Sequence, residues 1–258
     1  MTKTLILSPH VTSALSSLWR RMQKDFVISN SKDCDYRILA NGLPDELPNV
    51  IASIDTLVPH AECLSLAIDL FRTKTEYDRL LILDSDCFPI RSDWQTVLED
   101  LMGNKYEFAA PMRIENLDKF PHPCAFYMKR SYLDLAEFGE GQINNILGQP
   151  VMDVGGATPI IRSGKQIWLP LIKTNTVAPH CNYSTIYSDL FYHHGAGSRN
   201  IMTRATTSTY YKHMLKGDDH RKIYNWCTTR LREDPQKYFC LLRGISDPTE
   251  AQYGFLRS

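Results

Sequence analysis

The sequence lacks the signals of several protein classes. Its 258 residues include 29 Lys+Arg and 29 Asp+Glu, so the formal net charge is zero and no overall field attracts nucleic acid or an anionic membrane. No stretch approaches the roughly 20 apolar residues that a membrane-spanning helix requires. The apolar run at residues 4–7 is too short for a signal peptide. These absences predict a cytoplasmic protein without a transmembrane segment, which would lie in the host cytoplasm if the source is viral.

The cysteine spacing lacks the pattern of a zinc or redox motif. The closest two of the seven cysteines, Cys227 and Cys240, are 13 positions apart, so there is no C-x-x-C pair. An odd number of scattered cysteines indicates reduced thiols, as in a cytosolic protein.

Short apolar runs alternate with amphipathic helical patterns in the first hundred residues. With 43% hydrophobic and 22% charged residues, the composition is that of an ordinary globular protein. Strand–helix alternation predicts an α/β fold with a mainly parallel central sheet flanked by helices. The expected strands are residues 4–7, 36–39, 79–83, 108–111, 125–128 and 166–170. The expected helices are residues 12–25, 60–72, 131–138 and 156–163.

Two carboxylates follow the most apolar of these strands. Residues 80–83 are four consecutive aliphatics, as in a central parallel strand buried on both faces. Asp84 and Asp86, on either side of Ser85, then stand at its carboxyl end, where ligands of such sheets gather. Neighbouring carboxylates repel unless a cation joins them, and Mg²⁺ or Mn²⁺ would do so while leaving positions for phosphate. The alternative interpretation is a solvated Asp-x-Asp turn.

Residues 81–86 resemble the D-x-D motif of GT-A glycosyltransferases. The resemblance implies a Mn²⁺ or Mg²⁺ cofactor and a nucleotide-sugar donor, with Asp84 facing the ribose and sugar and Asp86 binding the metal directly. It also implies a Rossmann-like GT-A catalytic domain over residues 1–200. Residues 201–258, with ten Lys/Arg against six Asp/Glu, are then expected to form a mixed α+β extension packed on it, as a candidate acceptor-binding element.

Two later segments extend the resemblance to inverting, family 2-like enzymes. Residues 122–133 are similar to a turn, strand and helix close to the donor sugar in that family. Residues 152–170 are similar to its "Glu-Asp … helix … Gly-Tyr-Lys-Ile-Trp-x-x-Pro" stretch, although Met152 replaces the Glu. The Asp of that pair is the general base in inverting members, and Asp153 matches it. On its own, Asp153 would be interpreted as a helix N-cap.

Residues 191–199 resemble the "Val-Tyr-His-His-x-Gly-Gly-Ser" ending of the same catalytic domain. His193 is the preferred metal ligand and His194 the alternative, because a neutral imidazole can complete a metal shell begun by carboxylates. Arg199 can pair with a phosphate of the donor. A His-His pair by itself is more often part of the surface or core.

The nucleotide side of the site is less well marked. Ser8, Pro9 and His10 are expected to form a loop over the nucleotide. Asn41 stands where GT-A enzymes usually carry an acidic residue that reads uracil or ribose. UDP is the expected nucleotide.

Several functions remain open from the sequence. The acceptor is expected to be a glycan or lipid-linked glycan. The alternative is a hydroxymethylated base in phage DNA, contacted by basic and aromatic residues of segment 201–258. Two lesser alternatives are a sugar nucleotidyltransferase and a non-catalytic nucleotide-sugar-binding module. A nucleotidyltransferase usually has a Gly-rich loop after its first strand, and residues 8–10 do not offer one.

Overall fold

A computed structural model of the chain supplies the geometry. The described residues are 2–11, 14–42, 49–114, 118–139, 141–144, 147–148, 150–177, 184–195 and 217–245.

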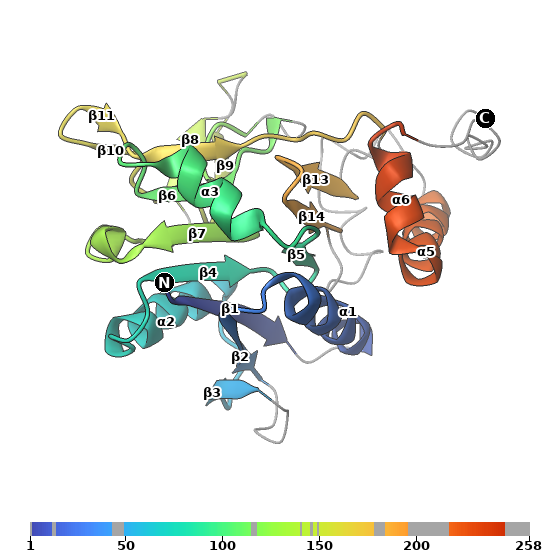
Figure 1. Ribbon diagram of the computed structural model, residues 1–258, viewed down its shortest axis with the longest axis horizontal. Coiled ribbons are helices and arrows are strands. Elements are labelled where there is room, and N and C mark those ends of the chain that lie inside the picture. Colours follow the sequence, from blue (N-terminus) through green and yellow to red (C-terminus); the bar gives the residue numbers. More distant parts are fainter. Residues whose placement is uncertain are drawn as a thin grey trace.

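A seven-stranded sheet forms the centre of the molecule (Figure 1). β7 runs antiparallel to both of its neighbours, and the other six strands run parallel to one another. The predicted α/β class with a mainly parallel sheet is therefore confirmed. In spatial order the strands are β12 (Trp168–Leu171), β6 (Phe108–Pro111), β7 (Ala125–Lys129), β4 (Arg79–Leu83), β1 (Thr4–Val11), β2 (Cys34–Asn41) and β3 (Val50–Ile54).

Both faces of this sheet are covered, which explains the continuous apolar run in β4. Leu81 and Leu83 pack into one core cluster, while Leu80 and Ile82 pack into the other. The first cluster contains side chains of α1 (Ala14–Asn30), α3 (Trp94–Met102), α5 (Gly217–Glu233) and α6 (Pro235–Leu242). The second contains those of α2 (His60–Thr73). Alternate side chains of a strand point to opposite faces, so burial of β4 on both faces requires every residue to be apolar.

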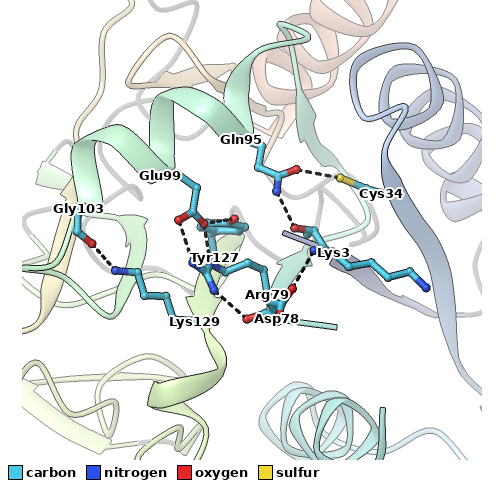
Figure 2. Close-up of polar contacts among 10 residues, drawn as sticks. Lys3, Cys34, Asp78, Arg79, Gln95, Glu99, Gly103, Tyr127 and Lys129 are labelled. Atoms are coloured by element: carbon cyan, nitrogen blue, oxygen red, sulfur yellow. Dashed lines mark hydrogen bonds and ion pairs between the residues drawn. The ribbon is translucent and has the colours of Figure 1, made fainter. Parts of the chain in front are cut away.

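A polar cluster fastens α3 to the sheet (Figure 2). Arg79 donates two hydrogen bonds to Glu99, at 2.6 and 2.9 Å, and the Tyr127 hydroxyl donates a third at 2.6 Å. One turn earlier, the Gln95 amide donates to Thr4 Oγ1 at 2.9 Å and accepts from the Cys34 thiol at 3.3 Å. These contacts join α3 to β1, β2, β4 and β7.

Smaller sheets surround the central one. β5 (Cys87–Pro89), β14 (Phe191–His193) and β13 (Thr185–Tyr187) form a three-stranded antiparallel sheet. β8 (Gly141–Asn144) pairs with β9 (Pro150–Asp153), and β10 (Ile161–Arg162) pairs with β11 (Lys165–Gln166). Figure 1 shows the three-stranded sheet between the central sheet and the helices α5 and α6. The described part of the extension, residues 217–245, is helical and shares a core with the domain before it.

Two expected helices are wrong. Residues 156–163 form turns and the first strand of the β10–β11 hairpin, where Ser163 and Gly164 adopt positive φ angles of 51° and 74°. Residues 131–138 carry only the end of a 3₁₀ helix, η2 (Arg130–Tyr132), followed by turns. None of the described helices is long and apolar enough to cross a membrane.

Candidate functional site

The Asp84–Asp86 segment is a tight turn between β4 and β5. The Cys87 amide donates to the Asp84 carbonyl at 2.9 Å, which closes the turn. The Asp84 amide donates to the Cys124 carbonyl at 2.9 Å, so the start of the turn is fixed to the residue before β7. Ser85 and Asp86 are 6% and 4% exposed. Two carboxylates are therefore held on a buried turn at the carboxyl end of the central strand.

Antiparallel pairing of β14 with β5 places a histidine beside this turn. His193 pairs with Cys87 in the register, and the His194 amide donates to the Asp86 carbonyl at 3.0 Å. His193 Nε2 consequently lies 3.6 Å from Asp86 Oδ1 and 3.9 Å from Asp84 Oδ2. More than one hundred residues of sequence separate the two parts of this cluster, and one strand pair joins them.

The three side chains fit a divalent cation. One ligand atom from each of Asp84, Asp86 and His193 lies within 4.8 Å of the other two. A small divalent cation sits about 2.1 Å from each ligand, so two ligands can be about 4.2 Å apart across it. The 3.6 and 3.9 Å separations lie inside that limit. Two carboxylates and an imidazole form a donor set that suits Mn²⁺, and the carboxylates also suit Mg²⁺.

Two further imidazoles surround Asp84. His60, the first residue of α2, places Nε2 at 3.3 Å from Asp84 Oδ1, and the His122 ring lies 5.8 Å from that of His193. Burial alone would raise the pKa of Asp84, but His60, His122 and His193 outweigh burial and lower the pKa well below its usual range. Asp84 is therefore ionised, as a metal-binding carboxylate must be.

His193 and His194 have different surroundings. Burial would lower the pKa of His193, but Cys124, Asp86 and Asp84 outweigh burial and raise the pKa to about 9, so a cation that binds His193 has to displace a proton. His194 is fully buried, its Nδ1 lies 2.8 Å from the Tyr192 hydroxyl, and its ring lies 4.4 Å from that of Trp19. Burial lowers the pKa of His194 to about 3. The geometry brings His193 to the carboxylates and places His194 in the core.

Asp153 is held by a partly buried arginine. Arg113 donates from Nη2 to Asp153 at 2.6 Å and to Asp118 at 2.7 Å, and the Val154 amide donates to Asp153 at 2.7 Å. Burial would raise the pKa of Asp153, but His122 and Arg113 outweigh burial and lower the pKa. Asp153 is therefore ionised, and the nearby charge of Asp84 opposes that ionisation.

A close backbone contact brings the Asp153 segment to the His122 segment. A Cβ atom at Gly155 would lie only 1.7 Å from the Pro121 carbonyl oxygen. The residues directly after Asp153 therefore pack against the residue before His122, and only glycine permits this approach.

The residues expected on the nucleotide side have structural partners. Ser8, Pro9 and His10 are buried within β1, so the expected loop over the nucleotide is wrong. Among the described strands, residues 8–11 pair with β2 alone, which explains why β1 can continue through a proline there. The Asn41 amide donates to the Val58 carbonyl at 3.0 Å and accepts from the Val58 amide at 2.9 Å. Arg199 lies outside the described residues.

Gln23 of α1 belongs to no recognised motif, yet it contacts the acidic turn directly. Gln23 is fully buried and donates from Nε2 to the carbonyls of Asp84 and Cys87, each at 2.7 Å. Its position was a usable signal, because Gln23 lies four residues from both Trp19 and Val27 on the buried face of the helix. A polar side chain in an apolar stripe requires a partner.

No protein-family model matches the chain, and no curated protein matches it. Solved structures do show similarity. A protein assigned as a nucleotide-diphospho-sugar transferase from Desulfovibrio desulfuricans G20 is 15% identical, with a TM-score of 0.46, covering 96% of this chain and 100% of that chain. A197 from STIV is 18% identical, with a TM-score of 0.43, covering 76% and 94%.

The mannosyltransferase PcManGT from Pyrobaculum calidifontis, solved with GDP-Man and Mn²⁺, is 11% identical with a TM-score of 0.40. The similarity covers 53% of this chain and 47% of that chain. The solved structures similar to this chain thus include nucleotide-sugar transferases. Similarity at this level assigns no activity, so the function has to be inferred from the residues of the site.

Proposed function

We propose that the chain is a metal-dependent glycosyltransferase that moves a sugar from a nucleotide-diphosphate donor, a UDP-sugar, to a hydroxyl acceptor with inversion. The observation that carries this proposal is the convergence of Asp84, Asp86 and His193 at the carboxyl end of β4. The order of the D-x-D, Asp153 and His193 segments in the sequence supports it independently.

Asp86 and His193 would hold the Mn²⁺ or Mg²⁺ ion, and Asp84 would face the ion with one oxygen and orient the ribose and sugar of the donor. When bound, such an ion neutralises the charge that develops on the departing nucleoside diphosphate. His60 contacts the Asp84 oxygen that lies away from His193, so Asp84 Oδ2 is left for the ion. Arg199 pairs with a donor phosphate.

Asp153 accepts the proton of the acceptor hydroxyl. The hydroxyl oxygen forms a bond to the anomeric carbon, and the bond from that carbon to the diphosphate breaks, with its electron pair leaving on the diphosphate. Arg113 and the Val154 amide fix the carboxylate, which stays ionised because its pKa is lowered. A weak base suffices, because the hydroxyl becomes far more acidic as its oxygen bonds to carbon.

The acceptor is a glycan or a lipid-linked glycan. The DNA alternative needs exposed aromatic side chains in the C-terminal extension to stack on an extruded base. Tyr224, one of the candidates, is 4% exposed and its hydroxyl accepts a hydrogen bond from Trp19 at 3.1 Å. Tyr224 therefore belongs to the core between α1 and α5 and is not available to stack on a base.

A thermal-shift screen tests the proposed donor and metal. UDP, GDP and CDP are each added with and without Mn²⁺, and we expect UDP with Mn²⁺ to raise the melting temperature more than the sum of the separate effects. Incubation with a panel of UDP-sugars and candidate glycans, followed by intact-mass analysis, then tests transfer. Indifference to all three nucleotides with Mn²⁺ would exclude a nucleotide-sugar transferase.

The acceptor is tested separately by its response to salt. Binding to DNA weakens steeply as salt increases, because each phosphate contact releases counterions. We expect no measurable binding to duplex DNA at about 0.15 M salt. Strong, steeply salt-dependent DNA binding would favour the hydroxymethylated-base alternative instead.

A further inference from the structure

We propose that Gln23 is a positioning residue of the metal site, whose side-chain amide fixes both ends of the Asp84–Cys87 turn and so holds Asp84 and Asp86 in the arrangement that binds a divalent cation. This inference rests on the proposed function, since it assigns a role toward the same ion. It adds a residue from α1 that binds no ion itself and that the D-x-D motif does not include.

The amide nitrogen of Gln23 is directed at the turn. Both of its hydrogens are used, one toward the Asp84 carbonyl and one toward the Cys87 carbonyl, each at 2.7 Å. The intervening Asp86 carbonyl accepts from the His194 amide at 3.0 Å. The carbonyls at residues 84, 86 and 87 are therefore all fixed, and the backbone directions that aim the two carboxylates are fixed with them.

The amide oxygen of Gln23 is anchored to the sheet. It accepts from His10 Nε2 and from the Tyr36 hydroxyl, each at 2.9 Å. Burial lowers the pKa of His10 to about 4, so the ring is neutral and carries its hydrogen on Nε2 when it donates to Gln23. A primary amide offers two donors and two acceptor positions, and Gln23 uses all four.

This arrangement requires an amide and excludes a carboxylate. Glutamate at this position could accept from His10 and Tyr36 but could not donate to two carbonyls when ionised. It would also add a third negative charge beside Asp84 and Asp86, which already repel each other in the absence of an ion. An aliphatic side chain would remove one hydrogen bond from each of four polar groups, including the two contacts that tie the turn to α1 through this side chain.

The positions of Asp84 and Asp86 depend on hydrogen bonds to the backbone of their turn, and Gln23 donates two of these bonds. Two adjacent carboxylates tend to separate until a cation binds, and a site that has to reorganise binds its ion more weakly. Residues that orient metal ligands through hydrogen bonds, without binding the metal themselves, typically raise the metal affinity about 10- to 100-fold. Gln23 is the described side chain that contacts the turn's backbone at both of its ends.

Gln23→Met tests the inference by direct measurement of Mn²⁺ binding. Methionine has nearly the volume of glutamine but no amide, and Mn²⁺ affinity is measured by electron paramagnetic resonance titration of the whole chain. We expect a 10- to 100-fold weaker affinity. The matched control is Gln95→Met, because Gln95 is also an α-helical glutamine with hydrogen bonds to β1 and β2, yet none to the acidic turn. The control should change Mn²⁺ affinity by no more than about twofold.

A second variant separates positioning from a loss of folding. Gln23→Asn keeps the amide but withdraws it by about 1.5 Å, one carbon–carbon bond, so it no longer reaches both carbonyls. Circular dichroism of the metal-free protein checks that each variant is folded. A folded Gln23→Asn protein should show weakened Mn²⁺ binding, and added Mn²⁺ should restore its metal-bound spectrum at higher concentration.

The outcomes distinguish this inference from the proposed function. If the unaltered chain binds Mn²⁺ and the folded Gln23 variants bind it equally well, the positioning role is refuted while the metal site stands. If the unaltered chain binds no Mn²⁺ or Mg²⁺, both proposals fall. If Gln95→Met weakens Mn²⁺ binding as much as Gln23→Met does, the effect comes from helix packing and the specific role of Gln23 is refuted.

Discussion

Gly155→Ala probes the contact that brings the Asp153 segment to the His122 segment. The added Cβ would lie 1.7 Å from the Pro121 carbonyl oxygen and 2.9 Å from its carbon. Cβ contacts below 3.0 Å essentially never occur, so the two segments would have to separate by roughly 1.3 Å. The obstacle is backbone, which cannot rotate away as a flexible side chain can.

The expected cost follows from this geometry. Overpacking typically costs about 1–3 kcal/mol, and a backbone obstacle places Gly155→Ala at the upper end, about 3 kcal/mol. For a domain of this size, each kcal/mol corresponds to a shift in melting temperature of roughly 2–4 °C, so we expect Gly155→Ala to melt roughly 6–12 °C lower. The displacement also moves Asp153 relative to Asp84, so transfer activity should fall more than donor binding does.

Gly139→Ala is the matched control in the same region of the chain. Its added Cβ would meet Ala157 Cβ at 3.5 Å, an ordinary contact. Replacing a glycine at a compatible position stabilises a protein by about 0.4–1 kcal/mol through the unfolded chain, so Gly139→Ala should melt at or slightly above the temperature of the unaltered protein. Differential scanning calorimetry measures all three proteins. Equal melting temperatures for the two variants would refute the close packing of residues 153–156 on residues 120–122.

Further predictions concern single side chains. Asp86→Asn should weaken Mn²⁺ binding by more than about 100-fold, because it removes a ligand outright; calorimetric titration checks this. His193→Ala should weaken Mn²⁺ binding similarly, whereas His194→Phe should retain the affinity and lower only the melting temperature. Asp153→Asn should keep UDP affinity and lower kcat by about 100-fold or more; full activity would exclude Asp153 as the base. His10 has a folded-state pKa of about 4, below its ordinary 6.5, so its contribution to stability is complete above pH 6.5 and is lost as pH falls toward 4. Urea titrations at pH 7.5 and 4.5 should show roughly 2–3 kcal/mol of acid destabilisation that is missing in His10→Gln.

The central strand and its acidic turn could be predicted from the sequence because local composition alone specifies them. Residues 80–83 are apolar without interruption, which only a strand covered on both faces requires, and the structure covers both faces of β4. Asp84 and Asp86 then fall at the sheet edge where charged ligands are bound. The structure also brings His193 to this turn, as the resemblance in residues 191–199 implied.

The errors lie where short-range patterns compete with turn geometry. Residues 156–163 have helical spacing of apolar residues, but Pro159 lacks a backbone donor and Gly164 permits the positive φ of a hairpin. Residues 8–10 were expected to form a loop, but β1 continues through Pro9. Its pairing with β4 ends at Leu7, and only β2 pairs with it beyond that residue among the described strands.

Other features of the site depend on contacts that no local pattern contains. Gln23, Tyr36 and the Asp84 turn belong to three separate elements and meet only after the sheet has formed. The ion pair between Arg113 and Asp153 likewise joins residues forty positions apart. A sequence can mark a buried polar residue as unusual, but its partner is determined by the tertiary fold.

The pairing of β5 with β14 has a consequence for how the protein matures. Asp84 and Asp86 are synthesised more than a hundred residues before His193. Until β14 is made, these two carboxylates repel each other without the imidazole of His193 beside them. Cation binding at full strength can follow only after the late strand has paired with the early one. An ion bound as proposed would therefore stabilise the folded chain by mass action rather than nucleate folding, and its retention would report that β14 has paired with β5.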